Sequence, residues 1–550
     1  MKLERNTVIE LSFNSAKTYA DPFNDASLFL EVTAPCGKVT RYPGFWKGGQ
    51  SWAVRFSAEK EGAYSYSTVC SDASDAGLNG MTGTLEVTGY TGKNPLYKHG
   101  RIKANGKYFE HSDGTPFFWL GDTWWMSLCK RMKFPEDLDT IINDRVEKGF
   151  TLIQIIAGLY PDMPPFDERG ANEAGFPWAE DFSTINPAYF DMMDRRIFKI
   201  IDAGLVPCIV GCWGYFIDFA GKEKLVRHWE NLIARYAAYP VVWCAAGEGT
   251  MAFYGYFEWS DERNEPFLAT KKDKKAEEAY VARAKSEWTD IMRTMRAYDP
   301  YHNAMSIHPS QFAHKTINDV SVLDFNMLQT GHGGEASLNN TVDMIIEAQE
   351  ATPDMPVLDT EVNYEGIGGM NGPDAQRFAF LSTVLMGAAG FTYGGNGIWQ
   401  INRPGQPFGP SPHGLSWGAV PWQETMAMPG SKHIGFAKKL LEKFDWQKFV
   451  YHPEWAPCAP ETPNVKRIYP VGLPDGTMIF FLPGCYGFTQ KTLVKGFTAE
   501  KYSVQFIDLI SGTEFPGGEV SPKNGEWTVK YLNRQFLPVY ADMLLVMKPV

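Results

Sequence analysis

Two short apolar runs in the middle of the chain each end in a glutamate. Residues 241–248 read VVWCAAGE, and residues 356–361 read PVLDTE. An apolar run of about four to eight residues bounded by turn residues predicts a strand buried on both faces. An acidic residue at the carboxyl end of such a strand lies at the mouth of a parallel barrel. We therefore expect Glu248 and Glu361 to supply the two carboxylates that cleavage of a glycosidic bond requires.

Strands and amphipathic stretches alternate through the centre of the chain. The predicted strands are residues 117–120, 151–157, 206–210, 241–246, 303–307, 323–328, 356–360 and 390–393. Eight strand–helix units over roughly 330 residues match a (β/α)8 TIM barrel. A helix of only one or two turns is expected between the fifth and sixth strands. An open doubly wound sheet is the alternative, but no Gly-rich phosphate loop follows an early strand and no P-loop motif occurs.

Short alternating runs punctuated by Gly and Pro flank this central part on both sides. Residues 51–56 and 63–69 show the pattern near the N-terminus, and residues 469–482 show it around the Asp475-Gly476 hairpin signal. The predicted fold class is α/β, a barrel between two antiparallel β-sandwiches. The predicted domains are residues 1–95, 96–440 and 441–550.

The ends of the eight strands predict the lining of the barrel mouth. Sugars stack on aromatic rings, and their hydroxyl groups form hydrogen bonds with carboxylates, amides and histidines. The predicted substrate-binding residues are Asp122, Trp124, Trp125, Tyr160, Trp213, Tyr215, His308, Gln329, His332, Tyr364, Glu365, Asn396 and Trp399.

Each of these residues also has a purely structural interpretation. Glu248 could cap the following helix, and Glu361 could pair with a nearby Lys or Arg. Asp122 could brace the first loop, the two histidines could be ordinary hydrogen-bonded side chains, and the tryptophans could be packing residues. Glu365 competes with Glu361 for the same role, but it falls beyond the strand end, which favours support or substrate binding. Placement of both glutamates on strands four and seven favours catalysis by Glu248 and Glu361.

Composition narrows the possible partners. The net charge of −12 argues against nucleic acid, because phosphate binding needs clustered Lys and Arg. The eight cysteines lack the spacing of structural zinc ligands, and we expect no metal and no cofactor. No apolar run resembles a signal peptide or a membrane span, which predicts a cytoplasmic protein. This interpretation does not cover a signal peptide that has already been removed. A carbohydrate substrate is expected, and a homo-oligomer remains possible.

Several motifs resemble a known family. Residues 118–125 (FWLGDTWW), 329–332 (QTGH), 357–366 (VLDTEVNYEG) and 390–400 (GFTYGGNGIWQ) are similar to the apiosidase-like glycoside hydrolases. The N-terminal part resembles the β-sandwich module that often precedes that domain, and the C-terminal part resembles a β-domain called collagen-binding.

The resemblance implies a retaining enzyme with its acid/base on strand four and its nucleophile on strand seven, which correspond to Glu248 and Glu361. Many relatives carry Asn before the strand-four acid, and some carry Asp as the acid, whereas this chain has Gly247-Glu248.

The sequence therefore predicts a glycoside hydrolase that acts by double displacement on the ends of oligosaccharides or on small glycosides. A catalytically inactive carbohydrate-binding or adhesion protein is the first alternative, and a transglycosidase using the same residues is the second. The insertion at residues 255–283, with its lysine-rich run, predicts a solvated face, a lid or an oligomer contact.

Overall fold

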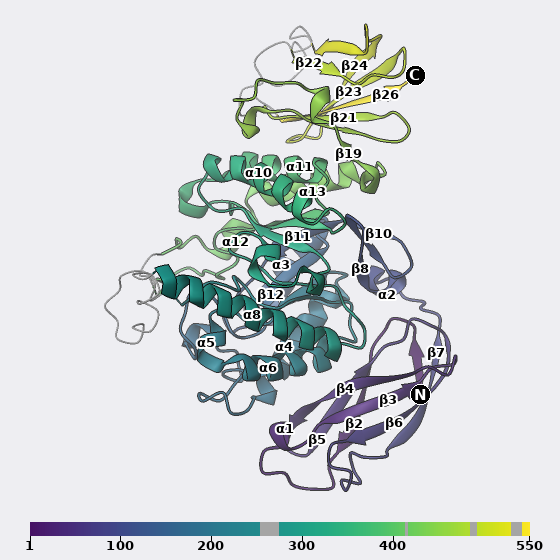
Figure 1. Cartoon of the computed structure of the whole chain (residues 1–550), viewed down its shortest axis with the longest axis vertical. Coiled ribbons are helices and arrows are strands. Elements are labelled where there is room, and N and C mark those ends of the chain that lie inside the picture. The colour runs from purple at the N-terminus through teal and green to yellow at the C-terminus, as the bar shows by residue number, and fades with distance from the viewer. Residues whose placement is uncertain (254–273, 413–415, 485–491, 530–541) are drawn as a thin grey trace.

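The computed structural model describes residues 1–253, 274–412, 416–484, 492–529 and 542–550. The barrel lies in the middle of an elongated molecule, with a β-rich part at each end (Figure 1). Of the insertion predicted at residues 255–283, residues 255–273 lie outside the described part, and helix α8 (Lys274–Tyr298) begins directly after them.

The N-terminal part is a β-sandwich with strand order β1-β7-β6-β3-β4-β5-β2. Strand β4 pairs with β3 through residues 39–43 and with β5 through residues 44–48, so this one strand turns from one layer into the other. All pairs are antiparallel except β1 with β7, which are parallel. The elements are β1 (Lys2–Glu4), β2 (Ile9–Asn14), α1 (Pro22–Asp25), β3 (Leu28–Thr33), β4 (Val39–Gly48), β5 (Ser51–Phe56), β6 (Gly62–Cys70) and β7 (Thr82–Thr88).

A short helix and a small sheet lead into the barrel. They are α2 (Pro95–His99), β8 (Ile102–Asn105), β9 (Tyr108–His111) and β10 (Pro116–Phe117). Phe109 of β9 contacts the rings of Trp119 and Phe325, with ring centroids 5.3 and 5.4 Å apart. Both partners stand where barrel strands begin, so this small sheet covers the end of the barrel opposite the mouth.

The eight predicted central strands form one sheet in the order β15-β14-β13-β12-β11-β18-β17-β16, and every pair is parallel. The two ends of this order meet, because Asp324 N donates to Met305 O at 2.8 Å and Ser306 Oγ donates to Phe325 O at 2.7 Å. The TIM barrel prediction is confirmed. The strands are β11 (Trp119–Thr123), β12 (Leu152–Ile156), β13 (Val206–Val210), β14 (Val242–Cys244), β15 (Met305–Ser306), β16 (Asn326–Gln329), β17 (Val357–Glu361) and β18 (Gly390–Tyr393).

The first strand differs from its predicted range. It was expected at residues 117–120, but β11 runs from Trp119 to Thr123, and Phe117 belongs to β10 instead. Asp122 therefore lies inside the strand rather than in the loop beyond it, which changes what its side chain can reach.

Helices cover the outside of the barrel (Figure 1). The predicted short helix between the fifth and sixth strands is α9, which has four residues. The helices are α3 (Glu136–Lys148), α4 (Pro187–Asp202), α5 (Phe216–Ala220), α6 (Lys222–Tyr236), α8, α9 (Ala313–Thr316), α10 (Glu335–Ala351), α11 (Pro373–Leu385), α12 (Trp422–Met426) and α13 (Pro429–Leu441).

The C-terminal part is built from a six-stranded antiparallel sheet, β19-β20-β21-β26-β23-β24, and a two-stranded ribbon, β22-β25. All of β21 is buried, because Phe481 and Ile479 pack toward the barrel helices while Phe480 and its neighbours pack into a second core. The strands are β19 (Val450–Tyr451), β20 (Tyr469–Gly472), β21 (Met478–Leu482), β22 (Thr492–Lys495), β23 (Tyr502–Asp508), β24 (Glu514–Val520), β25 (Glu526–Val529) and β26 (Met543–Pro549).

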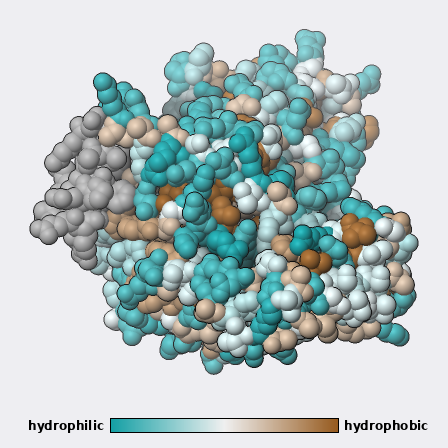
Figure 2. Space-filling model, turned by 60° about the horizontal axis from the view of Figure 1, so that its bottom comes forward, coloured by the Kyte–Doolittle hydropathy of each residue, from teal (hydrophilic) through white to brown (hydrophobic). Residues whose placement is uncertain are grey.

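Buried ion pairs join both flanking parts to the barrel. Arg55 of β5 pairs with Asp194 of α4, and Arg377 of α11 pairs with Asp542 next to β26 at 2.6 Å. Of the described helices, none has the length and apolar character needed to cross a membrane. Figure 2 shows hydrophobic residues in small groups among hydrophilic ones on one face, as is normal for a protein surface.

Candidate active site

Glu361, the last residue of β17, is held from three sides at the barrel mouth. Nε2 of His332 lies 3.0 Å from Oε1 of Glu361, and Nε2 of Gln329 donates to the same oxygen at 3.4 Å. Nε2 of His308 lies 3.2 Å from Oε2, although the alignment is not that of a good hydrogen bond. The three side chains stand at the ends of β15 and β16, so these two strands hold the carboxylate that β17 carries.

Glu248 follows β14 and is placed by an unusual backbone conformation. Its φ is +45°, in the left-handed region that residues other than glycine rarely adopt and that clusters at functional sites. Gly214 N donates to Gly247 O at 2.6 Å, which ties this loop to the end of β13. A Cβ at Gly247 would overlap the six-membered ring of Trp213. The absence of a side chain at Gly247 therefore has a steric reason.

The two carboxyl groups have pKa values pushed in opposite directions. Burial, and next the negative charge of Glu361, raise the pKa of Glu248 to about 8. Burial alone would raise the pKa of Glu361 as well, but the close contacts and charge interactions with His308 and His332 lower it to about 2. The Gln329 amide also acts to lower the pKa of Glu248, so it lies beside both groups. At neutral pH one carboxyl is protonated and the other is ionised.

Aromatic rings form a wall beside the two carboxyls. The ring centroids of Trp125 and Trp213 are 5.8 Å apart, and that of His308 is 5.7 Å from Trp125. The indole N–H of Trp213 lowers the pKa of Glu248 but has no well-aligned partner within the described residues. Gln329 Oε1 and His332 Nδ1 likewise have no partner there. These groups leave hydrogen-bonding capacity for a polar ligand next to an aromatic face.

Eight of the predicted site residues are thus brought together. They are Glu248, Glu361, Trp125, Trp213, His308, Gln329, His332 and Tyr364. Tyr364 belongs to this group because its ring centroid lies 4.7 Å from that of His332, and burial followed by the charge of Glu361 raises its pKa.

Asp122 and Trp124 lie outside this group, and their role in substrate binding stays a prediction. Asp122 is 0% exposed, and its Oδ2 accepts hydrogen bonds from Arg145 Nε at 2.6 Å and Trp124 Nε1 at 2.7 Å. Because Asp122 lies inside β11, its carboxylate meets Arg145 of α3 behind the strand. Both residues brace the barrel wall, which is the structural interpretation weighed above.

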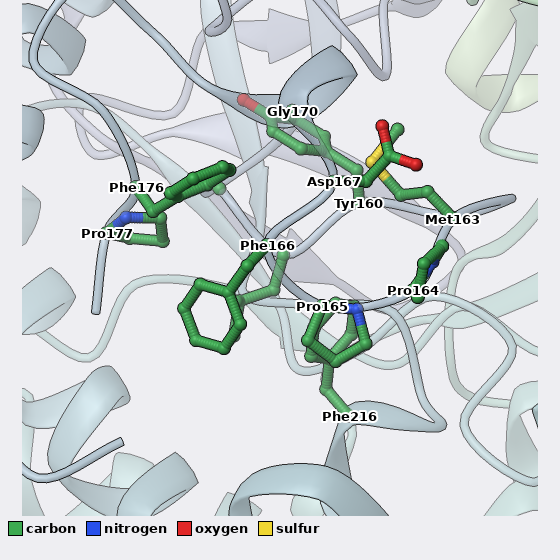
Figure 3. A pocket seen from close by; sticks show the side chains of 12 residues that line it. Tyr160, Met163, Pro164, Pro165, Phe166, Asp167, Gly170, Phe176, Pro177 and Phe216 are labelled. Atoms are coloured by element: carbon green, nitrogen blue, oxygen red, sulfur yellow. The ribbon is translucent and has the colours of Figure 1, made fainter. Parts of the chain in front are cut away.

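Tyr160 and Tyr215 are buried, and their hydroxyl groups have partners within the protein. Tyr215 Oη donates to the backbone oxygens of Tyr160 and Met163, both at 2.9 Å, and Tyr160 Oη lies 3.2 Å from Tyr189 Oη. Tyr160, Phe166 and Phe176 surround a small hollow in the loop after β12 (Figure 3). Its volume of about 20 Å³ admits about one water molecule and no sugar ring.

The last three predicted contacts hold loops together. Glu365 accepts from Tyr393 Oη at 2.6 Å and from Gly430 N, near the start of α13, at 2.9 Å. Asn396 Nδ2 donates to Trp417 O at 2.6 Å. Trp399 is 5% exposed and packs on Phe408. All three side chains are thus engaged within the protein, and their role in substrate binding stays a prediction.

Three residues near the site were missed. Gln154, a single polar residue inside β12, is fully buried and donates to Thr360 O at 3.1 Å, and its isolation in an apolar run was a usable signal. Asp162 has φ +58°, accepts from Trp417 Nε1 at 2.9 Å, and contributes to the raised pKa of Glu248. Asp162 and Trp417 lie in different loops, and no local pattern in the sequence marks either residue.

No group of three or more His, Cys, Asp or Glu among the described residues could hold a metal ion. The seven cysteines in the described ranges are free thiols.

Comparison with known proteins agrees with the site. The model of the apiosidase-like catalytic domain matches residues 103–448, and that of a domain of unknown function, DUF5060, matches residues 2–71. None of the curated proteins compared with the sequence matches it. Barrel, paired carboxyls and family match together define a glycoside hydrolase. The chain belongs to the apiosidase-like family, whose model covers more than half of it.

Solved structures share the fold at low identity. One, titled glycoside hydrolase, has a TM-score of 0.65 and 20% identity and covers 84% of this chain and 99% of its own. A family 5 glycoside hydrolase from Bacteroides vulgatus has a TM-score of 0.65 and 20% identity, covering 83% of this chain and 94% of its own. Another Bacteroides vulgatus protein aligns over 100% of both chains, with a TM-score of 0.69 and 18% identity.

Proposed function

We propose that this glycoside hydrolase works by retaining double displacement, with Glu361 as the nucleophile and Glu248 as the acid/base. Ionised Glu361 attacks the anomeric carbon while protonated Glu248 delivers its proton to the leaving oxygen. Water then attacks the glycosyl-enzyme, and Glu248 takes the proton of that water. The sugar is released with its original anomeric configuration.

The opposite pKa shifts of the two carboxyl groups carry this proposal. A nucleophile must be ionised and an acid must be protonated at the working pH, and environments that separate two pKa values assign those roles. The pKa of about 2 at Glu361 and of about 8 at Glu248 match the two roles. Neither carboxyl forms an ion pair with a Lys or Arg of the described residues, so neither is a structural salt bridge.

The closed side of the mouth supports cleavage at chain ends. Arg169, in the loop after β12, donates to Phe408 O and Pro410 O in the loop after β18, both at 3.2 Å. The bond from Trp417 to Asp162 joins the same two loops. Since β11 lies between β12 and β18 in the sheet, these loops meet above its end. A polymer passing straight through the site would have to cross them.

The test compares Glu361→Gln with Glu365→Gln, which alters the competing glutamate. On the aryl glycoside that the wild type cleaves best, Glu361→Gln should lose activity by about 10⁴-fold or more while remaining folded. Glu365→Gln should keep turnover, although its melting temperature should fall because an amide offers one acceptor oxygen where Tyr393 and Gly430 each bond to a separate carboxyl oxygen. Near-wild-type turnover by Glu361→Gln would refute the assignment.

Product analysis tests the finer points. NMR of the first product formed should show the anomer of the substrate, whereas the opposite anomer would mean inversion. Digestion of a polymer should release one small product, and a ladder of products would contradict the end-cleaving proposal. Products longer than the substrate would favour the transglycosidase, and binding without release of aryl groups would favour the adhesion protein.

Two predictions from the sequence remain open. The domain boundaries near residues 95 and 440 can be checked by limited proteolysis. The cytoplasmic location can be checked by fractionation of the producing cells.

A further inference from the structure

The mechanism above makes no use of a second buried acid that precedes Glu361 by two residues. Asp359 is 0% exposed, and its Oδ2 accepts a hydrogen bond from Thr330 Oγ1 at 3.0 Å. Among the described residues it forms no ion pair with a Lys, Arg or His. Burial raises the pKa of the Asp359 carboxyl well above its usual value.

A chain of hydroxyl groups runs from Asp359 to the outer helix layer. Thr341, on α10, donates from Oγ1 to Thr330 Oγ1 at 2.8 Å, and Thr330 in turn donates to Asp359. Both threonines are 1% exposed. These hydrogen bonds therefore link α10 to the end of β16 and to β17, and the bonded groups are shielded from water.

This series of hydrogen-bonded hydroxyl groups crosses β16 and β17 at the point where the pairing of the two strands is irregular. Leu328 pairs with Asp359, but the next residue, Gln329, pairs with Glu361, so Thr360 is an extra residue in β17. Thr360 Oγ1 donates to Leu328 O, and Thr330 N donates to Glu361 O, both at 2.9 Å. Such a bulge redirects the side chains beside it and often occurs next to active sites.

The bulge explains how two residues so close in sequence face different partners. In a regular strand, residues two apart point to the same face. Here Asp359 is bonded toward α10, whereas Glu361 contacts His308 and His332 at the mouth. The extra residue turns Glu361 toward the mouth, and the Thr330 bond to Asp359 spans the turn.

We propose that Asp359 is a positioning residue: with Thr330, it holds the bulge at Thr360 and so keeps Glu361 against Gln329 and His332. This inference rests on the proposed role of Glu361 as nucleophile. Thr330 is placed to transmit the effect, because it directly follows Gln329 and stands two residues before His332.

The test uses Asp359→Ala and Thr330→Val, each of which breaks the bond between Asp359 and Thr330. Both should lower kcat by about tenfold to a hundredfold, because small displacements of a reacting group are costly. KM should change by less than about threefold if the aromatic wall stays in place. The acidic limb of the pH profile should move to higher pH, since Glu361 loses part of its histidine contacts; a purely structural loss of folded enzyme would leave that limb unmoved.

A conservative variant and a double variant test the same inference further. Asp359→Asn should recover most of the activity, because the amide oxygen can still accept the hydrogen bond from the Thr330 hydroxyl. The double variant Asp359→Ala/Thr330→Val should be no worse than either single variant, as expected for two partners of one bond. The control is Thr383→Val, which removes a buried hydroxyl bonded to Ala379 O within α11.

An unmoved acidic limb in Asp359→Ala and Thr330→Val, or an Asp359→Asn variant as impaired as Asp359→Ala, would overturn the inference. If Asp359→Ala does not fold, the inference is tested by comparing kcat of Thr330→Val with that of Thr330→Ser. Serine keeps the hydroxyl that bonds to Asp359, so only the valine variant should be impaired. Glu361→Gln is measured alongside. If it is inactive, the nucleophile assignment stands whatever Asp359 does, and if it is active, that assignment fails by itself.

Discussion

Replacing Glu248 with Gln removes the only proton that the proposed acid can give while keeping the size of the side chain. With a pKa of about 8, Glu248 is about nine-tenths protonated at pH 7. General acid catalysis contributes about 10²- to 10⁴-fold, so the variant should lose about 3–5 kcal/mol of transition-state stabilisation on a phenyl glycoside. On a 2,4-dinitrophenyl glycoside it should lose less than about tenfold in the glycosylation step, because that leaving group needs no proton.

The assay is kcat/KM for both substrates from pH 5 to pH 10, with the sugar that the wild type accepts. On the phenyl glycoside the wild type should lose about tenfold per pH unit above about pH 8, since only protonated Glu248 can act as an acid. In Glu248→Gln this basic limb should be absent, and Glu365→Gln, which carries the same substitution outside the pair, should keep it. A basic limb near pH 8 that persists in Glu248→Gln would refute the reasoning. Equal losses on both substrates would refute it as well.

Two further predictions concern the surroundings of the pair. His332→Ala removes one of the contacts that lower the pKa of Glu361. That pKa should rise by about one unit, and the acidic limb of kcat/KM should shift to higher pH with it. The control His99→Ala removes a surface histidine paired with Asp113 and should leave the acidic limb in place. Gly247→Ala forces a methyl group into the Trp213 ring, so it should cost about 1–3 kcal/mol and lower both the melting temperature and kcat. The control is Gly89→Ala, whose added Cβ would meet only the end of the Glu61 side chain. A Gly247→Ala enzyme with the stability and rate of the wild type would contradict the prediction, because it would show that the Trp213 ring can move aside.

Several features of the site followed from short stretches of sequence. The apolar runs before Glu248 and Glu361 predict buried strands, and the barrel brings the carboxyl ends of such strands to one mouth. His308, Gln329 and His332 were found by the same argument, because each stands at the end of a predicted strand. The short α9 was expected from the spacing of the fifth and sixth strands.

The placements that differ from the expected ones arose where strand boundaries or loop paths decide which side chains meet. A shift of β11 by two to three residues was enough to move Asp122 from the predicted loop into the strand and toward Arg145. Asn396 and Trp399 were assigned from their distance along the chain after β18, but the loop folds back on itself and uses them internally. Asp162 meets Trp417 across 255 positions, a contact that no local pattern encodes.

The sequence by itself determined the kind of chemistry, since two glutamates after apolar runs among aromatic and amide side chains already suit a glycosidic bond. Only the tertiary structure decided which glutamate suits which role. Burial and the charge of Glu361 keep the proton on Glu248, while histidines from two other strands remove it from Glu361. The reason is physical: a pKa depends on the dielectric and the charges within a few ångströms, and those neighbours are contributed by residues far away in the chain.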